Sequence, residues 1–178
     1  WKFNKHLTFE RENFLAMSHH DLGSIFLRQN NYLQAQKDFS LARKSFSNMA
    51  ILEPSKQVLK YLEIMCYRME GEVFEAFGDM DQAIKKFRLA KEMYIQLSEI
   101  SQNKFVKDQI VFIQLYLICL PLKNQGMNNE ALEELKQCID NLDRFLETEP
   151  KNVKWEFDKV IALYNIANIY VSKQLFIE

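Results

Sequence analysis

The small and large apolar residues of the chain follow a spacing that repeats every 48 residues. One small residue per repeat stands at Gly23, Gly71, Cys119 and Ala167. A large apolar residue follows three positions after each of these, and a second small residue follows twelve positions after the first three, at Ala35, Ala83 and Ala131. A fixed interval of this size is typical of stacked units that each bury an apolar face against their neighbours. The pattern therefore predicts a repeat architecture, whose usual role is binding.

The sequence predicts helices over almost the whole chain. Glycine and proline are scarce, with four and three in 178 residues, so turns are few and the elements between them are long. Each helix should have about 22 residues and a length of about 33 Å. We expect an all-α fold of about seven long antiparallel helices, near residues 8–29, 32–52, 55–77, 80–101, 103–125, 128–148 and 151–173.

The repeated sequence resembles the tetratricopeptide family, whose signature joins W-x2-L-G-x2-Y to A-x3-F and a proline. Residues 22–26, Leu-Gly-Ser-Ile-Phe, match the first part, and residues 35–39, Ala-Gln-Lys-Asp-Phe, match the second. The small residues should let paired helices approach closely, with phenylalanines filling the space beside them. The resemblance implies a right-handed superhelix of helix pairs. It also places left-handed turns within each pair at 30–32, 78–80 and 126–128, where glycine or asparagine lowers the cost.

The repeat departs from that family in length and at two kinds of position. A family repeat has about 34 residues, and the placement of Pro54 and Pro150 at the junctions between units indicates that each helix has gained about two turns. Pro121 lies inside a predicted helix, removes a backbone hydrogen bond and should kink the helix toward its C-terminal end. The positions of the family tryptophan hold His19, Tyr67, Leu115 and Leu163.

We expect one solenoid segment over residues 1–178, with units near 8–53, 55–101 and 103–148 and a half unit at 151–178. The chain starts without an initiator methionine and stops inside a repeat, which predicts a fragment of a longer protein. Its last helix should then present an uncovered apolar face beside Leu163, Ile166 and Tyr170.

Composition narrows the class of protein. The net charge is -1, with acidic and basic residues interleaved, which argues against a nucleic-acid surface or a polybasic membrane anchor. The longest apolar run, 110–122, is shorter than the roughly 20 residues of a spanning helix, so we interpret it as a buried core helix without membrane insertion. Three cysteines without metal-ligand spacing predict reduced thiols and an intracellular, cytoplasmic location.

No candidate for catalysis or metal binding emerges. His19 and His20 are adjacent, so their side chains point about 100° apart on a helix and cannot easily share one ion. His19 should instead lie between packed helices. Cys119 and Cys138 should lie close together as buried thiols, with a disulfide as the less favoured alternative. We therefore expect no enzyme activity, no cofactor and no metal.

The family resemblance places binding in the concave groove lined by the first helix of each pair. Partner-binding candidates are His20, Ser24, Arg28, Arg68, Glu72, Tyr116, Lys123, Tyr164 and Asn168. Four apolar residues in the same phase have core packing as their simpler interpretation: Met17, Met65, Ile113 and Ile161. The Lys and Asn clamp with which some family members hold a terminal carboxylate is missing, because its positions hold His20, Ser24, Met69, Ile113 and Leu117.

These features favour a non-enzymatic scaffold that docks peptides or partner subunits in a large intracellular assembly, with cytoskeletal and ciliary complexes as candidate hosts. One alternative is a peptide-sensing regulator similar to bacterial pheromone receptors. Another is a tetratricopeptide-like subunit of a multi-subunit particle. All three imply protein or peptide partners and no nucleic acid.

Overall fold

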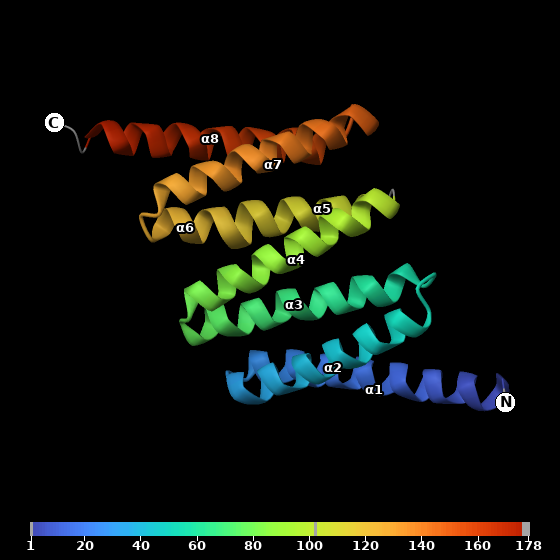
Figure 1. Ribbon diagram of the computed structural model, residues 1–178. Coiled ribbons are helices and arrows are strands. Elements are labelled where there is room, and N and C mark those ends of the chain that lie inside the picture. The colour runs from blue at the N-terminus through green and yellow to red at the C-terminus, as the bar shows by residue number, and fades with distance from the viewer. Residues whose placement is uncertain (1, 102, 176–178) are drawn as a thin grey trace. The chain divides into compact units, whose positions relative to one another are not determined.

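The computed structural model describes residues 2–101 and 103–175, and these residues form helices and short turns with no strand. The predicted all-α fold of consecutive antiparallel helices is confirmed (Figure 1). The helices are α1 (Lys2–Arg28), α2 (Tyr32–Leu52), α3 (Gln57–Phe77), α4 (Met80–Ile100), α5 (Lys104–Phe112), η1 (Ile113–Cys119), α6 (Leu120–Asn124), α7 (Asn128–Thr148) and α8 (Val153–Leu175). The first begins six residues before its predicted start because no glycine or proline lies in residues 2–8 to stop it.

The chain divides into two compact units, Trp1–Gln102 and Asn103–Glu178. In the first unit α1 packs on α2, α2 on α3 and α3 on α4. In the second unit α5, η1 and α6 follow one another as one rod, and α7 packs against this rod and against α8 (Figure 1). One continuous solenoid over residues 1–178 would require these two units to stack on each other, and it stays a prediction.

The turn inside each helix pair has the same backbone structure in all three places. Asn30, Gly78 and Gly126, each 48 residues apart, have φ of 59°, 91° and 76°. This left-handed conformation ends a helix at low cost for glycine and asparagine, as the sequence predicted. The next residue's N–H closes a Schellman motif onto a carbonyl five residues earlier, at 2.9 Å each time: Asn31 to Phe26, Asp79 to Phe74 and Met127 to Leu122.

The helix pairs meet most closely at the first small residue of each repeat. A Cβ atom on Gly23 would lie 2.8 Å from the ring of Phe39, and one on Gly71 would lie 2.5 Å from the ring of Phe87. Both rings are fully buried, so each phenylalanine sits directly on a glycine of the partner helix. The third repeat has Cys119 in place of the glycine and a leucine in place of the phenylalanine. The cysteine is larger than glycine, and the leucine that faces it is smaller than phenylalanine.

A buried carboxylate joins three helices of the first unit. Glu70 on α3 accepts a hydrogen bond from Arg43 Nε on α2 at 2.7 Å and from Lys86 Nζ on α4 at 2.5 Å. The Arg43 guanidinium also lies 4.5 Å from the centre of the Tyr67 ring, a cation–π contact. Tyr67 stands at a position of the family tryptophan. Its ring therefore forms one wall of this ionic cluster.

The predicted kink at Pro121 takes another form. Pro121 is the second residue of α6, and the seven-residue element before α6, η1, is a π-helix. Proline cannot donate a backbone hydrogen bond, and its ring conflicts with the carbonyl four residues earlier, at Leu117, inside η1. The wider π turn relieves this conflict. The irregularity consequently precedes Pro121 and lies closer to the middle of the rod than predicted.

The rod formed by α5, η1 and α6 is longer than the apolar run 110–122 that the sequence prediction considered. The helix over 104–124 is long and apolar enough to cross a membrane by length and composition, with a mean hydropathy of 1.5 over an 18-residue window. Core helices of water-soluble proteins meet the same criterion, and 56% of this window is buried inside the structure. Leu115 and Ile118 are among its fully buried side chains.

All three cysteines are free and buried, as predicted for reduced thiols. Burial raises the pKa of the Cys66 thiol from its ordinary value of 9.0 to about 12, and the nearby Glu70 carboxylate adds to the effect. In the unfolded chain the thiol ionises near pH 9, so ionisation favours unfolding above that pH. The stability contributed by the neutral thiol is fully present below pH 9 and is lost between pH 9 and pH 12.

We therefore expect the stability difference between the wild type and Cys66→Ala to depend on pH. Urea unfolding at pH 8 and pH 10.5 measures this difference, and the wild-type advantage should shrink by up to about 1.4 kcal/mol per pH unit above pH 9. Ionisable groups distant from Cys66 are present in both proteins and cancel. A difference independent of pH would contradict the raised pKa.

Candidate functional site

The predicted groove residues of the first unit lie along one face of α1 and one face of α3. His20, Ser24 and Arg28 recur every four residues on α1, and Arg68 and Glu72 do so on α3. Residues four apart lie on the same side of a helix. His20 and Arg68 are 48 residues apart and so occupy the same place in two successive repeats. The structure thus gives α1 and α3 polar residues at two equivalent places, His20 with Arg68 and Ser24 with Glu72.

The His20 side chain is more buried than expected for a residue that faces an open groove. Its side chain is only 15% exposed, and its ring meets the Phe39 ring edge-on at 5.8 Å. Nδ1 lies 3.4 Å from Asp21 Oδ1, whereas Nε2 is buried and has no hydrogen-bond partner among the described residues. Ser24 Oγ donates to the His20 carbonyl at 3.0 Å, and Arg28 Nε donates to the Ser24 carbonyl at 3.2 Å. Of these three residues, Arg28 is the exposed one.

Arg68 and Glu72 form an ion pair along α3. Arg68 Nη1 donates to Glu72 Oε1, and Nη2 lies 3.3 Å from the Met69 sulfur. Arg68 Nε is buried and has no hydrogen-bond partner in the described part of the chain. Burial raises the pKa of the Glu72 carboxyl against the opposing effect of Arg68, and it also raises the pKa of Glu75 one turn further on. This face of α3 therefore carries charge that is poorly solvated.

In the second unit two predicted groove residues instead hold helices together. Tyr116 on η1 donates its hydroxyl to Asp158 Oδ1 on α8 at 3.3 Å. Lys123 on α6 donates to Asn165 Oδ1 on α8 at 2.9 Å. Burial, followed by the effect of Asp158, raises the pKa of the Tyr116 hydroxyl. These two contacts attach α8 to the rod that precedes α7.

The two remaining groove candidates lie on α8. Tyr164 is exposed and Asn168 is partly buried. The sequence prediction missed Asp158 and Asn165, the acceptors for Tyr116 and Lys123. A signal for Asp158 was present, because the equivalent positions in the two preceding repeats hold Leu62 and Ile110, and a carboxylate among apolar residues requires a partner.

Of the four apolar residues of the predicted groove that we interpret as core, Met17, Met65, Ile113 and Ile161, only one is fully buried. Ile113 is completely buried, Met65 and Ile161 are partly buried, and Met17 is exposed. His19 lies between packed helices, as predicted. Its Nδ1 is 2.7 Å from Asp38 Oδ1, and this contact joins α1 to α2. In residues 2–101 and 103–175, no three His, Cys, Asp or Glu side chains are arranged to hold a metal ion.

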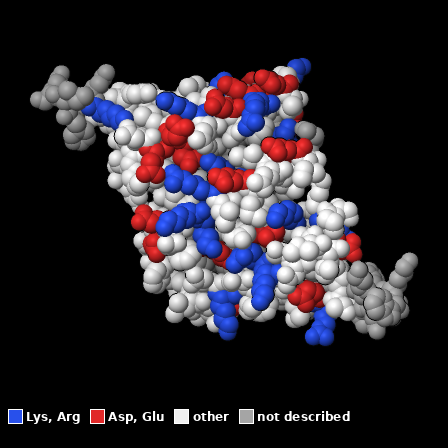
Figure 2. All heavy atoms as spheres, in the orientation of Figure 1, with Lys and Arg blue, Asp and Glu red and all other residues white. Residues whose placement is uncertain are grey.

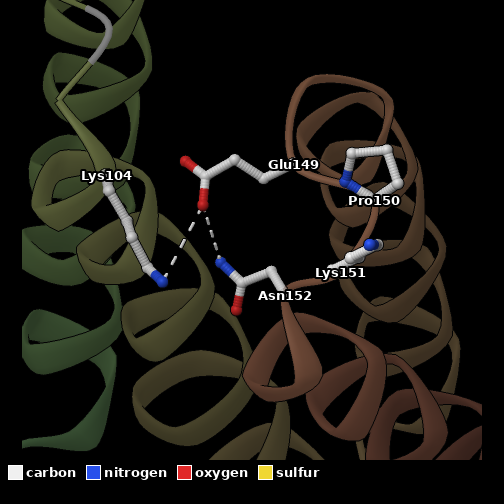
Figure 3. Close-up of a pocket in the computed structure, with 5 residues that line it drawn as sticks. All are labelled: Lys104, Glu149, Pro150, Lys151 and Asn152. Atoms are coloured by element: carbon white, nitrogen blue, oxygen red, sulfur yellow. Dashed lines mark hydrogen bonds and ion pairs between the residues drawn. The ribbon is translucent and has the colours of Figure 1, made fainter.

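A surface pocket of about 430 Å³ lies in the second unit between the start of α5 and the turn from α7 to α8. Figure 3 shows the Glu149 carboxylate between Lys104 and Asn152, with Pro150 and Lys151 on the far wall. Glu149 Oε2 is 3.8 Å from Lys104 Nζ and accepts a hydrogen bond from Asn152 Nδ2 at 3.2 Å. Lys104 is therefore already paired with a carboxylate of the protein, that of Glu149.

The outer surface carries charges of both signs. Figure 2 shows basic and acidic side chains interspersed on one face, with uncharged surface between them. Exposed pairs such as Lys159 with Asp143 belong to this pattern, and pairs of this kind contribute little to stability. This distribution agrees with the interleaved charges of the sequence.

No family model matches the sequence, and a search of curated proteins found no match. The tetratricopeptide resemblance rests on the residues quoted for it and stays a prediction. What the structure defines is the class: an all-α protein of stacked antiparallel helices.

Proposed function

We propose that this protein is a non-enzymatic scaffold that docks peptides or partner subunits on the polar face of α1 and α3. The observation that carries the proposal is the matched pair of buried nitrogens, His20 Nε2 and Arg68 Nε, which have no hydrogen-bond partner among the described residues. A buried polar atom without a hydrogen-bond partner costs about 1–3 kcal/mol. That both stand at the same place in successive repeats argues against two unrelated packing faults.

A peptide laid across these helices offers the hydrogen-bond partners that the two side chains lack. A carbonyl oxygen of an extended chain could accept from Arg68 Nε. A backbone N–H could donate to His20 Nε2, which is an acceptor when Nδ1 carries the hydrogen toward Asp21. The carboxylates of Glu72 and Glu75 could accept further backbone N–H groups. The two nitrogens are covered by neighbouring side chains, so docking requires His20 and Arg68 to turn outward. We expect a partner that binds mainly through its backbone, because the row mixes donors and acceptors.

We propose a large cytoplasmic assembly as the setting, with cytoskeletal and ciliary complexes as candidate hosts. Helices of 21 residues or more in α1 to α4 support this setting, since longer helices enlarge the docking surface of each repeat. The absence of a clamp for a terminal carboxylate favours an internal segment of the partner over its C-terminus.

We expect the double variant His20→Ala with Arg68→Ala to lose partner binding by roughly tenfold or more, the effect of removing hydrogen bonds from a charged donor. The measurement is affinity capture of partners from the native cell with quantitative mass spectrometry, followed by titration with the captured partner. The matched control is Lys37→Ala with Lys85→Ala, two exposed residues that are also 48 apart. Equal binding by both variants and the wild type would contradict the proposal.

A further inference from the structure

The last helix, α8, presents an apolar stripe that no described residue covers. Its members run along the full helix and are roughly half to three quarters exposed, from 48% at Tyr170 to 73% at Val153. They are Val153, Phe157, Val160, Leu163, Tyr164, Ala167, Tyr170 and Val171. Of the predicted uncovered face beside Leu163, Ile166 and Tyr170, Leu163 and Tyr170 belong to this stripe, whereas Ile166 is partly buried.

The stripe is distinct from the face by which α8 packs in its own unit. Trp155, Ala162 and Ile169 on that other face are buried, and the Trp155 ring lies 5.5 Å from Phe145 of α7. Trp155 Nε1 also donates to Asp108 on α5 at 2.7 Å. The helix is thus anchored on one side and apolar on the other, which is typical of a helix lying between two layers.

The spacing of the stripe is that of a coiled-coil seam. Its central members stand at 153, 157, 160, 164, 167 and 171, which alternates steps of four and three. This heptad pattern keeps one narrow line facing a partner helix of similar length. The exposed area of the eight residues is on the order of 800 Å², the contribution of each partner to a standard interface.

We propose that this stripe binds the same stripe of a second copy, with the two α8 helices antiparallel. An axis of two-fold symmetry beside residue 162 sets the largest member of the seam, Phe157, against the smallest, Ala167, in both halves. The same axis pairs Val160 with Tyr164 and Val153 with Val171. A parallel pair would instead set phenylalanine against phenylalanine and alanine against alanine, with crowding in one layer and a void in another.

The residues beside the seam agree with the antiparallel arrangement. Leu163, which is half exposed, meets its own copy close to the axis. The charged flanks meet uncharged ones, since Glu156 faces Tyr170 and Lys154 faces Asn168. No two like charges face each other, so nothing opposes the pairing. Such a contact is isologous and closes as a dimer.

The test is the mass of the 178-residue chain in solution by sedimentation equilibrium from 1 to 100 µM. We expect association to twice 21.2 kDa, and Val160→Glu should weaken it at least about a hundredfold because two carboxylates would enter the seam. The matched control is Val58→Glu on α3, since Val58 and Val160 are 58% and 61% exposed. Circular dichroism checks that both variants stay helical.

The pairing itself is tested by exchanging sizes. Phe157→Ala and Ala167→Phe should each weaken the dimer, and the double variant should restore it because every layer again joins a large and a small residue. Register follows from oxidation: Val153→Cys with Val171→Cys should cross-link two copies, whereas Val153→Cys alone should not. The native cysteines are buried and serve as an internal control.

A monomer at 100 µM, equal loss with Val58→Glu, or cross-linking by Val153→Cys alone would each overturn the proposal. A monomer whose stripe binds a synthetic peptide of residues 128–148, the sequence of α7, would also overturn it, because the stripe would then accept a helix of the α7 type and not a second α8. Tyr164 and Asn168 face the second copy in this dimer, so the scaffold proposal rests on α1 and α3. Its test with His20 and Arg68 can be repeated in monomeric Val160→Glu, which separates the two outcomes.

Discussion

Gly71→Ala is expected to lower the free energy of unfolding by about 2–3 kcal/mol, the cost of overpacking a tight core. The added Cβ would lie 2.5 Å from the Phe87 ring, and that ring is fully buried, so the packed side chains around it have to shift. Alanine is the better helix former by about 1 kcal/mol, so an exposed glycine would show the opposite sign. Urea unfolding followed by circular dichroism measures the change.

The third repeat suggests how to relieve the clash, because it pairs Cys119 with Leu135 where the second pairs Gly71 with Phe87. We expect Phe87→Leu to recover part of the stability lost in Gly71→Ala, although Phe87→Leu by itself leaves a cavity and destabilises. The control is Gly78→Ala, where a Cβ would meet nothing within 4 Å and only the positive φ opposes alanine. Its loss should be the same with Phe87 or Leu at position 87. Additive effects of Gly71→Ala and Phe87→Leu would contradict the steric explanation.

Glu70→Gln is the second substitution with a large expected effect, a loss of about 2–3 kcal/mol. The change keeps the size of the side chain but leaves Arg43 and Lys86 without their shared carboxylate. Breaking a fully buried ion pair costs about 3–5 kcal/mol. The lower figure applies because the two cations are 25% and 27% exposed and water screens them in part.

The matched control for Glu70→Gln is Asp143→Asn, which removes the carboxylate of the exposed pair with Lys159. We expect a change of at most about 1 kcal/mol there, as for surface ion pairs in general. Urea unfolding at low and high salt distinguishes the two sites further, since salt should reduce the small effect at Asp143 more than the large effect at Glu70. Equal losses at both sites would mean that the buried cluster contributes nothing special.

The candidate site was predicted less completely than the helices. The residue types on the inner faces of α1 and α3 followed from the 48-residue phase, and His20 and Arg68 do occupy equivalent places. Their surroundings did not follow, because the contact of His20 with Phe39 depends on the distance between two helices. Tyr116 and Lys123 likewise found acceptors on α8, which lie 42 residues away in the sequence.

The sequence by itself determined where most helices begin and end, and which turns are left-handed; the start of α1 is the exception. Those features depend on residues within five positions of each other: Asn30, Gly78 and Gly126 end their helices through local backbone bonds. Only the tertiary structure decided that Glu70 joins three helices and that Tyr116 and Lys123 bind acceptors on α8. Each of these depends on the distance and rotation between packed helices, which are set by the fit of whole side chains across an interface and leave no periodic trace in the chain.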